Sequence, residues 1–201
     1  MENKAWEDSL VHLFDHHSVE RLHDPERVTF QDPSRLFPLI RSFQKGNSAE
    51  IGAGSGYFFF PLCEYLNERG ICYAIELQPE MLVYFEKERS KRLQNLSIQT
   101  LLGSAESINL PDKSLELIWM VNVFHELTSA RQVLKEVYRV LAISGQFFII
   151  DWKKEETPVG PPISERASEV SLYDHLIDAG FTRIRSHDLY PYHYVVEAIK
   201  D

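Results

Sequence analysis

The chain has 201 residues, 44% of them hydrophobic and 25% charged, which is enough to bury the core of a single domain. Its 30 acidic residues against 21 basic ones give a net charge of −9, which disfavours a nucleic acid as partner. Cys63 and Cys72 form no CxxC and are too few for a disulfide framework. No apolar run has the length of a bilayer and no leader peptide is visible, so we expect a cytoplasmic protein without membrane insertion.

The N-terminal part is predicted to form a helical cap, residues 1–44, on a core formed by residues 45–201 of the same domain. Its first 31 residues are polar, rich in histidine and only weakly periodic. The segment "DPSRLFPLIRSF" then predicts a helix with Asp32 as N-cap and Pro33 at the first helical position. We expect the cap to fold over a ligand site and to place Arg27 near it.

Strands and helices alternate from residue 45 onwards. Buried or alternating apolar runs predict strands at 48–52, 71–76, 96–103, 115–123, 145–151, 181–189 and 192–200. Helical periodicity predicts helices at 57–70, 79–92, 129–141 and 168–180.

Capping residues set the ends of these helices. Gly70 and Gly180 close the first and the last of them, and Pro79 opens the second. Ser129 with Gln132 predicts a capping box for the third.

This order predicts a three-layer α/β fold of the Rossmann-like kind. The helical connections imply right-handed crossovers between parallel strands. The last two strands are joined by a short turn at Tyr190-Pro191, so they form a C-terminal hairpin with one antiparallel strand. We therefore expect a seven-stranded, mostly parallel sheet whose ligand lies beyond the carboxyl ends of the strands.

The first predicted strand runs into a glycine-rich loop, "EIGAGSG", with Glu50 ahead of three glycines. A second acidic residue, Glu76, ends the next strand, where a carboxylate can accept both hydroxyls of a ribose. Tyr57 and Phe59 stand where a GxGxxG dinucleotide loop needs its third glycine, and no Gly-Lys-Ser/Thr of a P-loop follows. A tight turn without ligand is the other interpretation of such a loop.

Four features together resemble the class I S-adenosylmethionine-dependent methyltransferases over roughly residues 45–199: "EIGAGSG", Glu76 in "YAIELQPEM", "GSAESINLPDKSLELIWMVNVFHEL" and the two-strand ending. Within that class, "LPDKSLELIWMVNVFHEL" is most similar to the small-molecule branch with the ubiquinone/menaquinone C-methyltransferases. The resemblance implies the cofactor S-adenosyl-L-methionine, its product S-adenosyl-L-homocysteine, and methyl transfer by in-line displacement to a small molecule.

The resemblance also implies which residues bind the cofactor. The methionine part would be contacted by Glu50, Gly52, Ala53, Gly54, Gly56, Val121 and Asn122. The ribose and adenine would be contacted by Glu76, Leu77, Ser104, Ala105 and Glu106. Ser104 departs from many relatives, which carry an Asp there, and a serine accepts more weakly and without charge.

Substrate is expected after the fourth and fifth strands. His125 is a candidate general base or a residue that supports its loop, and Asp151 either orients the acceptor or caps the loop. Trp152 can stack on a planar acceptor or belong to the core. Lys153 and Lys154 suit an acidic acceptor or form a solvated pair.

Other functions remain open from the sequence alone. His16, His17 and His23 lack a recognised metal spacing, so we expect no metal. The fourth strand ends in "VNVF" rather than an Asn/Asp-Pro-Pro-aromatic tetrad, which disfavours the nucleic-acid and glutamine amino-methyltransferases. The alternatives are a non-catalytic sensor of the methyl donor or its product, and an NAD(P)-dependent oxidoreductase. The oligomeric state is left open.

Overall fold

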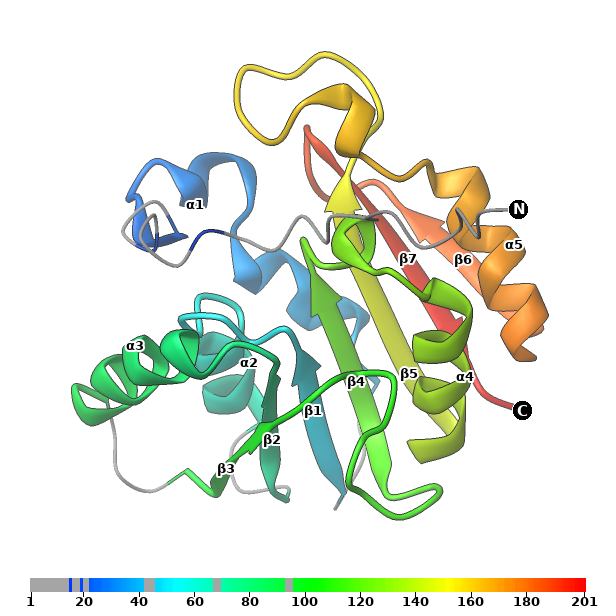
Figure 1. Cartoon of the computed structure of the whole chain (residues 1–201), viewed down its shortest axis with the longest axis horizontal. Coiled ribbons are helices and arrows are strands. Elements are labelled where there is room, and N and C mark those ends of the chain that lie inside the picture. The colour runs from blue at the N-terminus through cyan, green and yellow to red at the C-terminus, as the bar shows by residue number, and fades with distance from the viewer. Residues whose placement is uncertain (1–14, 16–18, 20–21, 42–45, 67–69, 93–95) are drawn as a thin grey trace, which may run out of the picture.

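A seven-stranded sheet with helices on both faces forms the centre of the molecule (Figure 1). The computed structural model describes residues 15, 19, 22–41, 46–66, 70–92 and 96–201. The strands follow the order β3-β2-β1-β4-β5-β7-β6. Their bounds are β1 Asn47–Ile51, β2 Cys72–Glu76, β3 Ile98–Leu102, β4 Leu115–Val121, β5 Leu141–Trp152, β6 Arg183–His187 and β7 His193–Ile199.

One strand, β7, runs against the others. The first five strands pair in parallel, whereas β7 pairs antiparallel with both β5 and β6. The predicted α/β fold, with one antiparallel strand in a hairpin, is confirmed. Because β7 is reversed, its first residue lies at the sheet edge where the parallel strands end, and His193 pairs there with Trp152.

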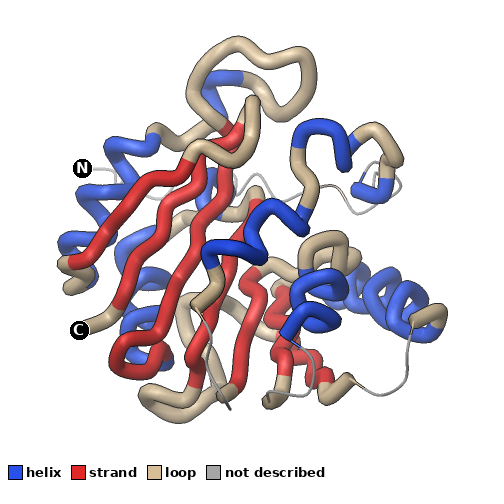
Figure 2. The backbone as a smooth tube through the Cα atoms, turned by 180° about the vertical axis from the view of Figure 1, so that it is seen from behind, coloured by secondary structure: helices blue, strands red, loops and turns tan. Residues whose placement is uncertain are grey.

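Helices form the two outer layers (Figures 1 and 2). One face packs against α2 (Phe59–Leu66), α3 (Pro79–Ser90) and the 3₁₀-helix η2 (Pro33–Leu39). The other face packs against α4 (Ala130–Val140) and α5 (Glu169–Ala179). The remaining short helices are α1 (Arg27–Phe30), η3 (Phe124–Glu126) and η4 (Ile163–Glu165).

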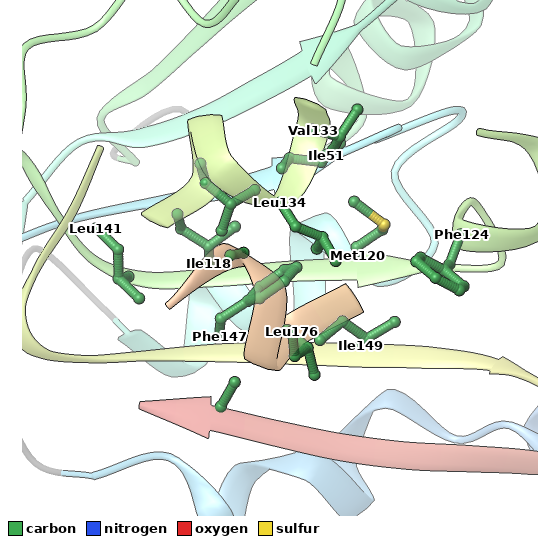
Figure 3. Packing of buried hydrophobic residues seen from close by; sticks show 14 of the residues in the cluster. Ile51, Ile118, Met120, Phe124, Val133, Leu134, Leu141, Phe147, Ile149 and Leu176 are labelled. Carbon is green, nitrogen blue, oxygen red and sulfur yellow. The ribbon is translucent and has the colours of Figure 1, made fainter. Parts of the chain in front are cut away.

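The alternation of β4 and β5 side chains explains why two cores form. Figure 3 shows the α4/α5 side, where strand residues meet helix residues from both elements: Ile118, Met120, Phe147, Ile149, Leu134 and Leu176. The intervening strand residues, such as Trp119 and Phe148, enter the opposite core with α2 and η2. Both cores consist of packed hydrophobic residues, so the central strands are covered on both faces and a ligand site is expected at their ends.

Several local predictions need correction. The helix that follows Asp32 is a 3₁₀-helix, because Pro38 lies inside it and a proline cannot donate the bond that an α-helix needs there. The Asp32 cap itself forms, accepting from the Ser34 N–H at 2.8 Å.

The capping box at α4 does not form. Ser129 makes no side-chain cap bond, and its carbonyl accepts the Gln132 N–H instead. Strand β5 begins at Leu141 rather than at residue 145, directly at the end of α4. By contrast Ser168 caps α5, and Gly180 ends it with a φ of 107°, as predicted.

Part of the predicted N-terminal cap lies outside the described residues. This includes residues 1–14, 16–18, 20–21 and 42–45, and with them His16 and His17. Within the described part, η2 packs in the α2 core, whereas α1 lies beyond the carboxyl ends of the strands, where Phe30 faces Trp152 and His193 (Figure 2). None of the helices in the described part of the chain has the length and apolar character needed to cross a membrane.

Candidate active site

The glycine loop adopts a backbone that side chains disfavour. Gly52, Gly54 and Gly56 all have positive φ, at 68°, 55° and 87°. A Cβ on Gly52 would lie 2.4 Å from the Val123 side chain, so at this position both conformation and space require glycine. At Gly54 the nearest atom would be 3.6 Å away, so the conformation alone requires glycine there.

Glu76 is held against this loop by main-chain hydrogen bonds. Its Oε2 accepts the Gly54 N–H at 2.8 Å, and its Oε1 accepts the N–H groups of Leu77 and Gln78, each at 2.9 Å. The side chain is buried at the carboxyl end of β2. The carboxylate is therefore fixed in position at the glycine loop, and its remaining lone pairs can accept from a ligand.

Glu50 is buried at the other end of the loop. Burial raises the pKa of this carboxyl well above its usual range, and the nearby Trp119 indole and Arg27 guanidinium offset only part of the rise. Glu50 Oε2 has no hydrogen-bond partner within the described residues. The indole N–H of Trp119, the cross-strand neighbour of Glu50, is likewise unpaired, and it is a donor within the chain that faces this carboxyl.

The N-terminal segment reaches the same place. The amides of Gln31 and Asn122 bond to each other in both directions, each at 3.2 Å, across 91 residues of sequence. Asn122 has a φ of 57°, a conformation that asparagine tolerates. The Tyr57 hydroxyl donates to the Gln31 carbonyl at 3.2 Å.

The predicted Arg27 is found close to this site. Its guanidinium lies 4.0 Å from the centre of the Tyr57 ring and donates to the Gln31 side chain and the Leu22 carbonyl. Burial lowers the pKa of Arg27 to about 10. The group is still a cation at neutral pH, and it adds positive charge beside Glu50.

His125 and Asp151 come together at the ends of β4 and β5. The distance between His125 Nδ1 and Asp151 Oδ1 is 2.7 Å. The second oxygen of this fully buried carboxylate accepts the His125 N–H at 3.1 Å, and Oδ1 also accepts the Trp152 N–H at 2.7 Å. Burial lowers the pKa of His125, but the Asp151 hydrogen bond and charge, with Glu126 and Glu165, outweigh it and leave the pKa raised.

The comparisons with known proteins agree with this geometry. A family model described as "Methyltransferase domain" matches residues 49–149. A solved structure titled as a SAM dependent methyltransferase from Aquifex aeolicus is 32% identical, with a TM-score of 0.85, over 94% of this chain and 100% of that one. The chain belongs to the class I S-adenosylmethionine-dependent methyltransferases.

Two curated relatives match the methyltransferase over part of their length. The "Uncharacterized methyltransferase YcgJ" of Bacillus subtilis is 32% identical over 111 residues, which are 55% of this chain and 42% of the relative. A demethylmenaquinone methyltransferase of Lactobacillus johnsonii is 26% identical over 112 residues, which are 55% of this chain and 45% of the relative. The matched segments thus span less than half the length of these two relatives.

The cofactor of this methyltransferase is S-adenosylmethionine, and the site fits it. The cofactor brings an ammonium and ribose hydroxyls as donors, and the site offers the open Glu50 oxygen and the fixed Glu76 carboxylate. The left-handed Gly54 leaves room for close approach to the main chain. The residues present therefore suit a nucleoside that carries an amino acid.

The other predicted cofactor residues differ in whether their side chains are accessible to a ligand. Leu77 is 49% exposed at the end of β2, so an adenine can cover it. Ser104 Oγ accepts the Glu106 N–H at 3.1 Å, and Glu106 accepts from Thr128 at 3.4 Å. By contrast, Ala53 and Val121 are buried in the α2 core, and Ala105 packs against the α4 core. Only the main chain of Val121 and Ala53 can face a ligand.

The predicted substrate residues also differ in whether their side chains are buried or exposed. Trp152 is buried at the edge and packs against the buried His193, with ring centres 4.0 Å apart and ring planes inclined by 40°. Lys153 donates to the Pro191 carbonyl at 3.1 Å and Lys154 is exposed, which agrees with a structural and a solvated lysine. Among the described residues, no cluster of His, Cys, Asp and Glu is arranged to hold a metal ion.

Sequence reasoning missed four residues of this edge: Phe30, Gln31, Arg166 and His193. Arg166 is buried and ties down the loop after β5, donating to the carbonyls of Lys153, Glu155 and Pro161. Phe30, Gln31 and His193 reach the site through contacts with residues far away in the sequence. The contacts of Arg166 are within its own loop, but no sequence motif marks it.

Proposed function

We propose that this methyltransferase transfers a methyl group to a small-molecule acceptor bound at the carboxyl edge of the sheet. The observation that carries the proposal is the Glu76 carboxylate, held by three main-chain N–H groups beside a left-handed glycine loop. The printed names of relatives include demethylmenaquinone methyltransferases, which supports a small organic acceptor. The net charge of −9 supports the same class of acceptor over a nucleic acid.

In this proposal the glycine side of the edge holds the cofactor. Glu76 accepts both ribose hydroxyls, and Leu77, Ser104, Ala105 and Glu106 surround the adenine. The amino-acid part lies along the main chain of Gly52, Ala53, Gly54 and Gly56, near the main chain of Val121. Glu50 and Asn122 face its ammonium.

Arg27 faces the carboxylate of the same amino-acid part. When bound, the cofactor supplies an electrophilic methyl on a positively charged sulfonium, which suits the acidic lining formed by Glu76 and Glu106.

His125 is the residue that we propose as general base. Asp151 accepts from Nδ1–H, so Nε2 is the nitrogen that is left to take a proton from the acceptor. The raised pKa brings His125 towards the range in which a base and its conjugate acid are both present near neutrality. Asp151 acts as a positioning residue, fixing the ring and the tautomer. The remaining contribution is alignment of the donor and acceptor and exclusion of water.

Thermal-shift measurements with S-adenosylhomocysteine, S-adenosylmethionine and NAD test the cofactor half of the proposal. Stabilisation by the first two and none by NAD is expected. Glu76→Gln should weaken S-adenosylhomocysteine binding by about 100-fold, because two charge-assisted hydrogen bonds are lost. The matched control is Glu80→Gln, an exposed carboxylate at the start of α3. Equal binding by Glu76→Gln and its parent would refute the ribose assignment.

Measurements of turnover test the second half of the proposal, the transfer of the methyl group to a small molecule. A metabolite extract incubated with labelled methyl donor should yield a labelled small product with the parent protein. Strong cofactor binding without any labelled product, across extracts and pH values, would favour a sensor of the methyl donor over an enzyme.

A further inference from the structure

A groove beside α2 is separate from the candidate active site. It lies between the segment of residues 23–37 and α2, and its volume of about 670 Å³ is within the range of roughly 300–1,000 Å³ that is typical of small-molecule sites. Among the described residues, those that line it include neither Glu76 nor His125. Val28 and Tyr65 in its walls are 50% and 39% exposed, so the groove opens to solvent and a ligand can reach it.

The walls of the groove are aromatic and apolar. They are formed by three rings and three prolines, namely Phe37, Tyr57, Tyr65, Pro25, Pro33 and Pro61. Phe37 from η2 and Tyr65 from α2 stack on each other, with ring centres 4.4 Å apart and ring planes within 14°. The face of an aromatic ring carries negative charge density, so such walls can bind an apolar body and also attract a cation.

Two carboxylates of the groove have no cationic partner. Asp24 accepts the Glu26 N–H through Oδ1 at 2.9 Å, and Asp32 accepts the Ser34 N–H through Oδ1 at 2.8 Å. Neither carboxylate forms an ion pair within the part of the chain that the structure describes. The second oxygen of each is therefore left to accept from a ligand.

The basic residues of the groove do not offset this negative charge. Arg92 pairs with the third carboxylate of the groove, Glu64, at 3.4 Å and lies 4.8 Å from the centre of the Phe60 ring. Burial lowers the pKa of His23, and nearby cations add to this against the charge of Glu88, so the ring is neutral at neutral pH. Three carboxylates against one guanidinium give the groove a net charge of −2, which favours a cation over an anion.

We propose that this groove is a second ligand site and that it takes an organic cation, an amine with an apolar body. The body lies against the rings of Phe37 and Tyr65, and the ammonium is held by the charges of Asp24 and Asp32. Because the ligand contacts both residues 23–37 and α2, it ties the segment that carries Arg27 to the core. The proposal does not depend on the proposed function, since the groove lies outside the cofactor and acceptor halves of the active site.

Three probes that share one apolar body and differ in charge test the site: 4-phenylbutylammonium, 4-phenylbutan-1-ol and 4-phenylbutanoate. Each is titrated into the full chain and followed by NMR. The ammonium should bind about tenfold more tightly than the alcohol, since one charge-assisted hydrogen bond corresponds to about 1.4 kcal/mol, and the carboxylate should bind most weakly. Equal binding of the ammonium and the alcohol, tightest binding of the carboxylate, or no binding of the ammonium at its solubility limit would each overturn the proposal.

A double variant tests the two carboxylates. Asp24→Asn with Asp32→Asn removes both charges and keeps both main-chain hydrogen bonds, because an amide oxygen still accepts. This variant should bind the ammonium within about twofold of the alcohol. The matched control is Glu26→Gln, which removes an exposed carboxylate of the same segment outside the groove and should keep the preference of the parent. An unchanged preference in the double variant contradicts the proposal.

A pair of substitutions at Tyr65 tests the aromatic wall. Tyr65→Leu should weaken binding of the ammonium about fivefold, because the ring that packs on its body and attracts its charge is lost. Tyr65→Phe keeps the ring and should bind as the parent does. If Tyr65→Leu binds the ammonium as tightly as the parent, the wall is not part of the site and the proposal fails.

The parent alone locates the probe, so this measurement does not depend on how a variant folds. On addition of the ammonium, the amide signals of Val28, Asp32 and Tyr65 should shift, and those of Gly54 and Glu76 should stay in place. Saturating S-adenosylhomocysteine should leave the affinity for the ammonium within about twofold. Shifts confined to the cofactor half, or displacement by S-adenosylhomocysteine, would refute the second site. A parent that binds the ammonium but not S-adenosylhomocysteine loses the proposed function and keeps the groove.

Discussion

The main chain forms one half of the candidate site, and side chains form the other half. On the β1/β2 side the main chain forms the site. Three left-handed glycines shape the loop, and backbone N–H groups hold Glu76 in position. On the β5/β7 side, side chains from α1, η3, β5 and β7 meet, and His193 is left with open nitrogens. Main-chain conformation therefore shapes the first half, whereas the packing of side chains from distant segments shapes the second.

This difference has a consequence for substitution. A side chain on the acceptor half can be exchanged without moving the main chain that binds the cofactor, so acceptor preference and cofactor affinity should respond to separate sets of variants. The following predictions test that separation, beginning with the largest expected effect.

Gly52→Ala should damage the cofactor half alone. An alanine at a φ of 68° is strained by roughly 1–2 kcal/mol, and its Cβ would in addition meet Val123. We expect S-adenosylhomocysteine affinity to fall on the order of 100-fold by calorimetry, with the pKa of His125 in the other half unchanged by NMR titration. Gly103→Ala is the matched control, since no atom lies within 4 Å of its added Cβ. A changed pKa of His125 in Gly52→Ala would show that the halves are not separate.

Asp151→Asn should damage the acceptor half alone. It breaks a buried ion pair with His125, and we expect about 3 kcal/mol of stability to be lost at pH 6 in chemical denaturation. S-adenosylhomocysteine affinity should stay within about twofold of the parent. Asp178→Asn, an exposed carboxylate on α5, is the control for the change of charge.

The effect of Asp151→Asn should also depend on pH. The pKa of His125 is raised in the fold, so its protonation stabilises the parent fully below the ordinary value of 6.5, and this contribution is lost as the pH rises through the raised value. The stability difference between parent and variant should therefore be larger at low pH than at high pH. In the variant burial still lowers the pKa of His125, and only the charges of Glu126 and Glu165 still raise it, so an NMR titration should find that pKa below its value in the parent. A pKa equal to the parent's would rule out Asp151 as the cause of the rise.

Arg27→Met should lower the affinity for S-adenosylhomocysteine without lowering the stability of the fold. Arg27 is a buried cation whose pKa is lowered by burial, so replacing it with an apolar chain of similar length should leave the melting temperature unchanged or raise it. S-adenosylhomocysteine affinity should fall about tenfold, because the ligand carboxylate loses its cation. Arg35→Met, at an exposed position on η2, should change neither. Unchanged affinity in Arg27→Met would remove Arg27 from the cofactor half.

The Gln31–Asn122 amide pair is the contact that joins the N-terminal segment to the cofactor half, and it should give the smallest effect. A double-mutant cycle with Gln31→Ala and Asn122→Ala should yield a coupling of about 1 kcal/mol in the free energy of unfolding. Additive effects of the two substitutions would mean that the pair contributes no stability.

The cofactor half could be predicted from the sequence, because its residues lie close together along the chain. The glycine loop and Glu76 lie within one strand–helix–strand unit, so their spacing along the chain already encodes their geometry. The apolar runs of β4 and β5 likewise predicted buried strands. The reversal of β7 agrees with the predicted antiparallel strand of the C-terminal hairpin, whereas the order of the strands was not predicted.

The acceptor half could not be assembled from the sequence in the same way. Phe30 and His193 carry no motif, and they meet only because α1 lies against the sheet edge where β7 begins. Asp151 and His125 were selected separately, each as the residue after a strand, and only the pairing of β4 with β5 brings them to 2.7 Å. At η2, the position of Pro38 overrode the helical periodicity.

The position of β7 has a consequence for how the molecule folds. Strand β7 follows β6 in sequence but lies between β5 and β6 in the sheet, so β6 touches the sheet only through β7. The hairpin must then close on itself before or while it docks on β5. His193 pairs with Trp152 in that docking, so the strand that joins the sheet there completes the edge at which His125 and Asp151 lie.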